Sequence, residues 1–263
     1  MKHSELLHSE VHGEHGTPLI LMHGLLGSSR NWRSIAKELG TYFQVHCLDL
    51  RNHGNSFHDP EASIQGMSDD LLRYLDDHEI SNLNLCGHSL GGKVAMRFAC
   101  DSPSRVLKLI IADIAPRDYP REHHIPTLDS LLDINLSQLS SRKQTDELLS
   151  EKIPNWAFRQ FLLTNLIQNE DTFKWRANIQ VLRDSIGQLS SNPLNNGDHF
   201  SGPSLFIRGG KSGYLRSEHE PDIIKYFPAA EFEELPNAGH DVHVEDRAGF
   251  LSALDEFLLI PRV

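Results

Sequence analysis

The residue best placed for chemistry in this sequence is Ser89, at the centre of the GHSLG run of residues 87–91. The run follows the short apolar stretch 83–86 and precedes a segment of helical periodicity, which predicts a tight turn from a strand into a helix. Glycines two residues before and two after the serine let the strand and the helix approach closely, and the turn exposes the hydroxyl. A five-residue motif of this kind can occur by chance, so the strand and the helix expected on either side of it are the evidence that favours a nucleophile at Ser89.

A second glycine-containing loop, HGLLG at residues 23–27, follows the apolar stretch 18–22. Taken alone, the loop is more typical of an ordinary strand-to-helix turn. Beside a serine nucleophile, however, such a loop can supply one backbone N–H to an oxyanion, and the residue after the nucleophile supplies a second. We therefore expect the N–H groups of Leu25 and Leu90 to form an oxyanion hole.

A serine hydroxyl is a poor nucleophile unless a base accepts its proton and a carboxylate orients that base. The chain has 16 histidines. His240 is favoured because the NAGH run 237–240 follows the last expected strand and precedes the final helix. We expect His243 to begin that helix and to pack locally. His23 and His88 flank the site on backbone turns, where a supporting role and a purely structural role both remain open.

Short apolar runs bounded by glycine or proline alternate with amphipathic segments along the chain, which is typical of parallel strands joined by helices. We expect an α/β fold with a mostly parallel central sheet and helices on both faces. Helices are expected to start near Ser28 or Ser29 and near Ser68, to span about 90–100, and to run from about 245 to 259. The expected strands are 6–11, 18–22, 44–50, 83–86, 106–112, 204–208 and 231–235.

The alternation stops after Ile114, and residues 116–202 show helical periodicity with no convincing strand. We therefore expect a core domain of residues 1–115 and 203–263, with residues 116–202 inserted as a helical cap, or lid. Because this segment leaves and re-enters the sheet at strand ends, where open α/β sheets bind ligands, it is expected to lie over the site. Its aromatic residues, such as Phe158 and Phe161, are expected to bury the cap against the body or to line a pocket for an acyl chain.

Composition excludes several function classes. The formal net charge of -11 has the wrong sign for a protein whose main partner is nucleic acid. With 39% hydrophobic and 23% charged residues and no long apolar run, we expect no membrane span. The first sixteen residues lack an apolar core behind a basic start, which favours a cytoplasmic location. Neither the three cysteines nor the histidines stand at metal-ligand spacing, so we expect no metal.

The chain resembles the α/β-hydrolase family nearly from end to end. The RNHG run at 51–54 and the DIAP run at 113–116 are the more selective features, and they make it similar to the bacterial YbfF-type esterases and their mitochondrial relatives. The resemblance implies the α/β-hydrolase fold, a serine esterase or thioesterase with nucleophile, acid and histidine in that chain order, and no metal or organic cofactor. The runs that carry it are HGLLGS at 23–28, DLRNHGNS at 49–56, GHSLGGK at 87–93 and NAGHDVHVE at 237–245.

The sequence departs from most of the family at the turn after the expected strand 204–208. Most members place the acid there in a GxxD turn, whereas this chain reads GGKS at 209–212. A hydroxyl cannot stabilise an imidazolium as a carboxylate does, so the negative partner must come from elsewhere at the same sheet edge.

Asp113 ends the strand next to the nucleophile's strand, and some family members use that alternative position. We therefore assign Ser89, Asp113 and His240 as the catalytic triad, with Ser212 as a supporting hydrogen-bond partner. The alternative for Asp113 is a turn-forming aspartate with no part in catalysis.

These residues predict a serine hydrolase that cleaves short- to medium-chain carboxylic esters, or thioesters including acyl-coenzyme A, through an acyl-enzyme on Ser89. Basic residues within 116–202 would suit the phosphates of coenzyme A if several face the entrance. Two alternatives are a lyase resembling the menaquinone-pathway enzyme, which usually has arginine where this chain has Lys93, and a non-enzymatic ligand receptor. The expected partner is a small-molecule ester or thioester, and the oligomeric state stays open.

Overall fold

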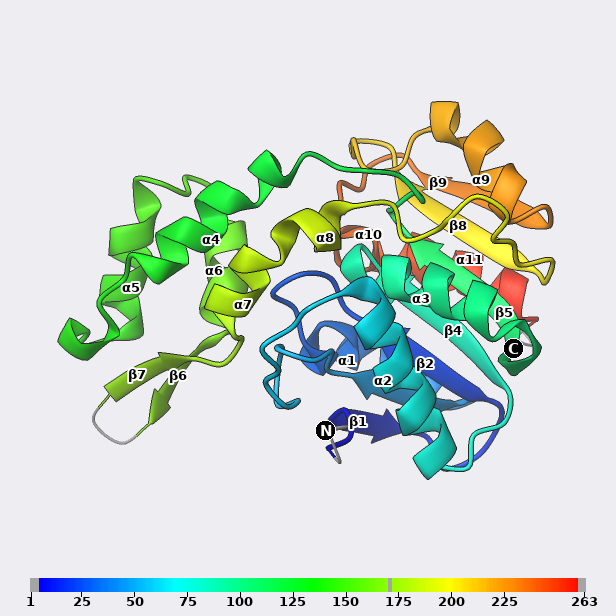
Figure 1. Ribbon diagram of the computed structural model, residues 1–263, viewed down its shortest axis with the longest axis horizontal. Coiled ribbons are helices and arrows are strands. Elements are labelled where there is room, and N and C mark those ends of the chain that lie inside the picture. Colours follow the sequence, from blue (N-terminus) through cyan, green and yellow to red (C-terminus); the bar gives the residue numbers. More distant parts are fainter. Residues whose placement is uncertain (1–4, 170–171, 260–263) are drawn as a thin grey trace.

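The computed structural model describes residues 5–169 and 172–259. Its centre is a sheet with the strand order β1-β3-β2-β4-β5-β8-β9 (Figure 1). β1 pairs antiparallel with β3, and every other neighbouring pair is parallel. The fold is therefore the expected mostly parallel α/β sheet. The strands are β1 (Ser9–His12), β2 (Pro18–Met22), β3 (Gln44–Leu48), β4 (Leu83–His88), β5 (Val106–Ala112), β8 (Ser204–Gly209) and β9 (Ala230–Leu235).

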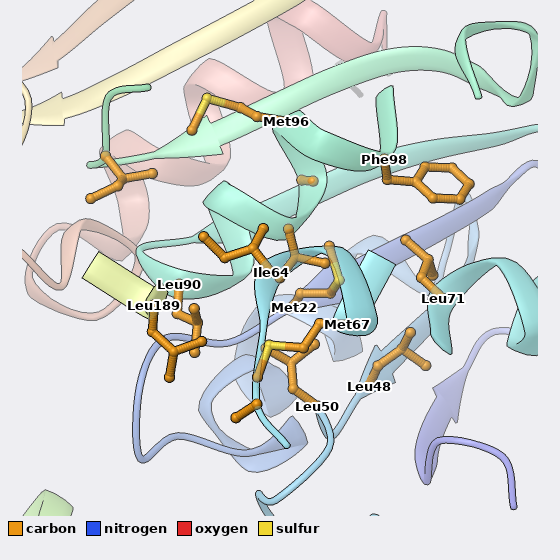
Figure 2. Packing of buried hydrophobic residues seen from close by; sticks show 14 of the residues in the cluster. Met22, Leu48, Leu50, Ile64, Met67, Leu71, Leu90, Met96, Phe98 and Leu189 are labelled. Atoms are coloured by element: carbon orange, nitrogen blue, oxygen red, sulfur yellow. The ribbon is translucent and has the colours of Figure 1, made fainter. Parts of the chain in front are cut away.

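Helices cover both faces of the sheet, so the inner strands are apolar on both sides. Leu19 and Leu21 of β2 pack with the face that carries α1 (Arg33–Leu39) and α11 (Arg247–Leu258). The alternate residues Ile20 and Met22 belong to the opposite layer, which contains α2, α3 and α9 and is shown around Met22, Met67 and Phe98 in Figure 2. These three helices are α2 (Ile64–Asp77), α3 (Leu90–Asp101) and α9 (Glu220–Tyr226).

Between β5 and β8 the chain leaves the sheet and forms a separate group of elements to one side of it (Figure 1). We expected only helices here, and the strand pair β6–β7 corrects that expectation. Each strand has four residues and the side chains of β7 are half-buried or exposed, so no apolar run marks them. The elements are α4 (Ile125–Leu132), α5 (Arg142–Ser150), α6 (Trp156–Leu163), β6 (Leu166–Asn169), β7 (Thr172–Trp175), α7 (Ile179–Asp184) and α8 (Ile186–Ser190), with 3-10 turns Arg121–His123 and Leu136–Gln138.

Several expected boundaries shift. α2 begins at Ile64 because the Ser63 hydroxyl accepts a hydrogen bond from the Gly66 N–H, so Ser68 lies inside the helix rather than at its start. The final helix is two helices, α10 (Val242–Glu245) and α11, and the Asp246 carboxylate caps the second. The helix expected near Ser28 begins as the 3-10 turn Ser29–Trp32 before α1. β1 begins three residues later than the expected strand at 6–11.

Candidate active site

The side chains singled out in the sequence come together at the carboxyl ends of neighbouring strands. Ser89 directly follows β4, Asp113 directly follows β5, and His240 lies in the loop after β9. Because β4, β5, β8 and β9 are adjacent and parallel, their carboxyl ends meet at one edge of the sheet. Residues more than a hundred positions apart in the chain are therefore brought within hydrogen-bond distance.

Ser89 stands on a strained turn. Its backbone has φ 51° and ψ -115°, a region that non-glycine residues rarely occupy and that costs about 1–3 kcal/mol. The turn needs the flanking glycines: a Cβ added at Gly87 would lie 2.2 Å from the carbonyl oxygen of Gly91, and one added at Gly91 would lie 2.5 Å from that of Met22. The GHSLG run thus has these glycines because a Cβ at either position would collide with backbone atoms of the turn or of β2.

A hydrogen-bonded chain links Ser89, His240 and Asp113. The Nε2 atom of His240 lies 3.0 Å from the Ser89 Oγ, and its Nδ1 atom lies 2.8 Å from the Asp113 Oδ2. An ionised carboxylate can only accept hydrogen bonds, so Nδ1 carries the proton and Nε2 is left to accept from the Ser89 hydroxyl. This is the arrangement in which a histidine can take the proton of a serine.

Asp113 is fully buried and held by further donors. The Gly209 N–H donates to its Oδ1 at 3.0 Å, and the Ser212 hydroxyl donates to its Oδ2. Its backbone has a positive φ of 51°, and its N–H donates to the carbonyl of Ile207 on β8. The hydroxyl at position 212 therefore contacts the same carboxylate oxygen that bonds His240, as expected for a supporting partner.

The two flanking histidines, His23 and His88, form hydrogen bonds with backbone groups rather than with the reacting side chains. His23 Nε2 accepts from the Leu50 N–H at 3.1 Å, so its Nδ1 donates to the carbonyl of Gly24 at 2.7 Å. The Nε2 atom of His88 lies 2.9 Å from the carbonyl oxygen of His240 and donates to it. Burial lowers the pKa of His23 and lowers that of His88 to about 4, so both rings are neutral near pH 7.

The expected oxyanion donors lie beside the serine. Leu90 is the first residue of α3, so its N–H has no acceptor within the helix. The next amide, of Gly91, donates to the carbonyl of His23 at 3.1 Å, which ties the start of α3 to the loop that carries Leu25. Leu25 and Leu90 both line a small cavity at Ser89.

A larger cavity of about 190 Å³ opens over Ser89 and His240. The body supplies the loop 24–27, while the segment between β5 and β8 supplies His124, Leu128 and Phe161. Burial lowers the pKa of His124 to about 4, so this imidazole is uncharged near pH 7. The lining thus combines apolar side chains with polar groups that include the carboxyl group of Asp241.

Sequence reasoning missed three residues around the site. The ring of Tyr214 stacks on the imidazole of His240 with centroids 3.9 Å apart, and the Tyr119 hydroxyl donates to the carbonyl of Tyr214 at 2.7 Å. The buried Lys93 ammonium donates to the carbonyls of Ser190 and Ser191 at 2.7 and 2.6 Å. Only Lys93 had a sequence feature that could have indicated a role, because it is a lysine one helical turn after the nucleophile among apolar residues of α3.

Metal and membrane features are absent from the part of the chain that the structure describes. In residues 5–169 and 172–259, no group of three or more His, Cys, Asp or Glu side chains is arranged to hold a metal ion. Within the same residues, no helix combines the length and the apolar character that crossing a bilayer requires.

Comparison with known proteins shows the family to which this chain belongs. A family model described as alpha/beta hydrolase fold matches residues 17–247. The sn-1-specific diacylglycerol lipase ABHD11 of Xenopus laevis is 38% identical over 250 residues, which covers 92% of this chain and 80% of the lipase. Esterase YbfF of Escherichia coli (strain K12) is 32% identical over 243 residues, covering 92% and 93% of the two chains. A solved structure titled marine microorganism esterase superposes with a TM-score of 0.94 at 37% identity, covering 97% of this chain and 100% of the esterase. The chain therefore belongs to the α/β-hydrolase family, among relatives named as esterases and lipases.

Proposed function

We propose that this protein is a serine hydrolase that cleaves carboxylic esters through an acyl-enzyme on Ser89. The observation that supports the proposal most strongly is the continuous hydrogen-bonded chain from the Ser89 Oγ through both nitrogens of His240 to the Asp113 carboxylate. A serine in this arrangement gains a base for its proton and a buried negative charge that stabilises the resulting imidazolium.

The first half of the reaction forms the acyl-enzyme. His240 Nε2 takes the Ser89 proton as Oγ bonds to the ester carbonyl carbon, and the N–H groups of Leu25 and Leu90 stabilise the oxyanion. His240 then gives the proton to the leaving oxygen, so the carbon–oxygen bond breaks and an alcohol departs.

The second half releases the acid and restores the enzyme. Water loses a proton to His240 Nε2 as its oxygen attacks the acyl carbon, and the proton returns to Ser89 Oγ as the carboxylic acid leaves. No other reactant is required.

We also propose that residues 116–202 act as a cap on this site. The segment is hydrogen-bonded to the body at two points. The Asn165 Nδ2 donates to the carbonyl of Leu26, which lines the larger cavity, at 2.7 Å, and the Asn178 N–H donates to that of Asn52 at 2.9 Å. Its side chains form one wall of the larger cavity. A cap in this position limits the size of the substrate and excludes water from the reacting atoms.

Uncharged esters fit this site better than thioesters of coenzyme A. The described residues that line the two cavities at Ser89 include no arginine, and three basic side chains of the cap form ion pairs with carboxylates. These ion pairs are Arg159–Asp146 at 2.7 Å, Arg183–Asp129 at 2.8 Å and Lys152–Asp133 at 2.7 Å.

Hydrolysis of p-nitrophenyl acetate by the purified protein tests the proposal. The Ser89→Ala variant is expected to lose at least about a thousandfold in kcat. Ser137→Ala, at an exposed serine of the cap, is the matched control and is expected to keep wild-type kinetics. Equal rates for wild type and Ser89→Ala, with both folded, would rule out the mechanism.

A further inference from the structure

Ser89 lies between two cavities of very different size. The larger has a volume of about 190 Å³ and the smaller about 30 Å³, and Ser89, Leu25, His124 and Tyr214 line both. The larger exceeds the roughly 150 Å³ of an apolar cavity that is able to bind benzene. The smaller is only two to three times the roughly 10–15 Å³ that a cavity needs to hold one water molecule. The two sides of the nucleophile therefore accept groups of very different bulk.

The position of His240 decides which part of an ester occupies which cavity. In the tetrahedral intermediate, the oxyanion points to the N–H groups of Leu25 and Leu90, and the leaving oxygen must reach His240 Nε2 to receive its proton. His240 lines the larger cavity, whereas the described residues that line the smaller one include Leu25 and Leu90 but not His240. The alcohol therefore leaves on the side of the larger cavity. Beyond the oxyanion donors, the smaller cavity is lined by the apolar side chains of Ile114, Ile186 and Leu189, where the acyl chain can lie.

We propose that the smaller cavity is the acyl pocket and that it restricts this enzyme to esters of very short acids, acetyl or propionyl, with larger alcohols. The inference rests on the proposed function and adds the substrate class. Ser89 Oγ bonds to the acyl carbon and the carbon–oxygen bond to the alcohol breaks, with the serine proton passing through His240 to the departing oxygen.

The wall of the smaller cavity is held in place. Leu189 of α8 lies beside Leu90 of α3 in Figure 2, and both side chains line this cavity. The end of α8 is anchored to the body, because the Lys93 ammonium donates to the carbonyls of Ser190 and Ser191. With the ammonium 4.8 Å from the ring centre of Tyr119, which lines the same cavity, the wall has little freedom to make room for a longer chain.

A series of p-nitrophenyl esters tests the proposal in the wild-type protein, because the leaving group stays constant while the acyl chain grows. We expect kcat/KM to be highest for the acetate or propionate and to fall roughly a hundredfold by the hexanoate and octanoate. Rising values up to the octanoate would overturn the acyl-pocket assignment while leaving the esterase mechanism intact. Failure of every ester to react would instead count against the proposed function.

Two leucine substitutions test which of the two cavities sets the preference for acyl-chain length. Leu189→Ala enlarges the smaller cavity and is expected to raise the ratio of hexanoate to acetate kcat/KM roughly tenfold. Leu128→Ala, the matched control, makes the same change at a buried leucine that lines the larger cavity, and is expected to leave this ratio unchanged. It should instead improve acetates of bulkier alcohols.

If Leu189→Ala does not fold, as judged by circular dichroism, Leu189→Val makes a smaller change in the same direction and is expected to give a smaller increase in the ratio. A folded Leu189 variant with the wild-type chain-length profile, or a Leu128→Ala variant that shifts the acyl profile instead, would overturn the assignment.

Discussion

Replacement of Asp113 by asparagine changes one atom of a fully buried side chain and removes its charge. In the native protein the Oδ1 atom accepts from the Gly209 N–H, and the Oδ2 atom accepts from Ser212 and from His240 Nδ1. If the asparagine oxygen keeps its bond to Gly209, its NH₂ group faces the imidazole and donates where the carboxylate accepted. His240 must then carry its proton on Nε2, where it can no longer accept from Ser89.

The expected fall in kcat has two causes: the change of tautomer, and loss of the charge that stabilises the imidazolium. In serine triads the comparable change lowers kcat by about 10⁴, which corresponds to about 5 kcal/mol of transition-state stabilisation. We expect a loss of roughly 10³–10⁴ in kcat for Asp113→Asn on p-nitrophenyl acetate. KM should change little, because the carboxylate does not line either cavity at Ser89.

A second substitution separates loss of charge from loss of structure. Ser212 contacts the Asp113 oxygen that bonds His240, so an aspartate at 212 can bring a carboxylate to the same imidazole nitrogen. The double variant Asp113→Asn/Ser212→Asp is expected to recover part of the lost kcat, whereas Asp113→Asn/Ser212→Ala is not. A folded Asp113→Asn enzyme with a rate within about threefold of wild type would refute the assignment of Asp113.

Three further predictions concern the elements around the site. Gly87→Ala would place a Cβ 2.2 Å from the carbonyl oxygen of Gly91, so the turn must shift and kcat is expected to fall about a hundredfold; wild-type kcat would contradict this. Lys93→Met leaves buried carbonyls at the end of α8 without their donor, and urea unfolding should show about 2 kcal/mol less stability. The exposed Lys37→Met is the control, and equal stability of the two variants would contradict the anchoring role. The free energy of unfolding is also expected to fall by about 3 kcal/mol between pH 6 and pH 5. Buried neutral histidines have lowered pKa values, so the unfolded chain binds protons in this range that the folded chain does not. This stability is present above the unfolded pKa near 6.5 and is lost as the pH falls toward the folded values, and a flat urea profile over this range would contradict it. The figure of about 3 kcal/mol is worked from three of these histidines: His46 and His88, each with a pKa lowered to about 4 by burial, and His53, with a pKa lowered to about 3.

Much of the sheet was predictable because its inner strands are buried on both faces. The runs that became β2 and β5 are apolar at almost every position, and the turn after β4 needs glycines at fixed offsets. These features depend on residues that are close together in the sequence, so the sequence alone predicts them. Comparison with known proteins confirms the fold and the family.

Other features depend on contacts between distant parts of the chain. The role of Lys93 can be recognised only in the folded protein, where its ammonium bonds the end of α8. The role of Tyr214 likewise depends on the stacking of its ring on His240. The β6–β7 hairpin is stabilised by pairing of two short strands with little burial, which leaves almost no apolar pattern. Asp113 could be proposed from the sequence because it ends an expected strand, but its three donors come from residues at or after the ends of β8 and β9, far away in the sequence.

Covalent labelling with a fluorophosphonate tests the central claim most directly, because this reagent bonds to a serine only when a base has activated it. Peptide mass spectrometry and residual esterase activity are followed on the same sample. We expect one adduct per chain at Ser89, loss of activity in proportion to labelling, and no adduct at this position in His240→Ala. Full labelling of Ser89 with esterase activity retained, or activity lost through labelling at another residue, would contradict it.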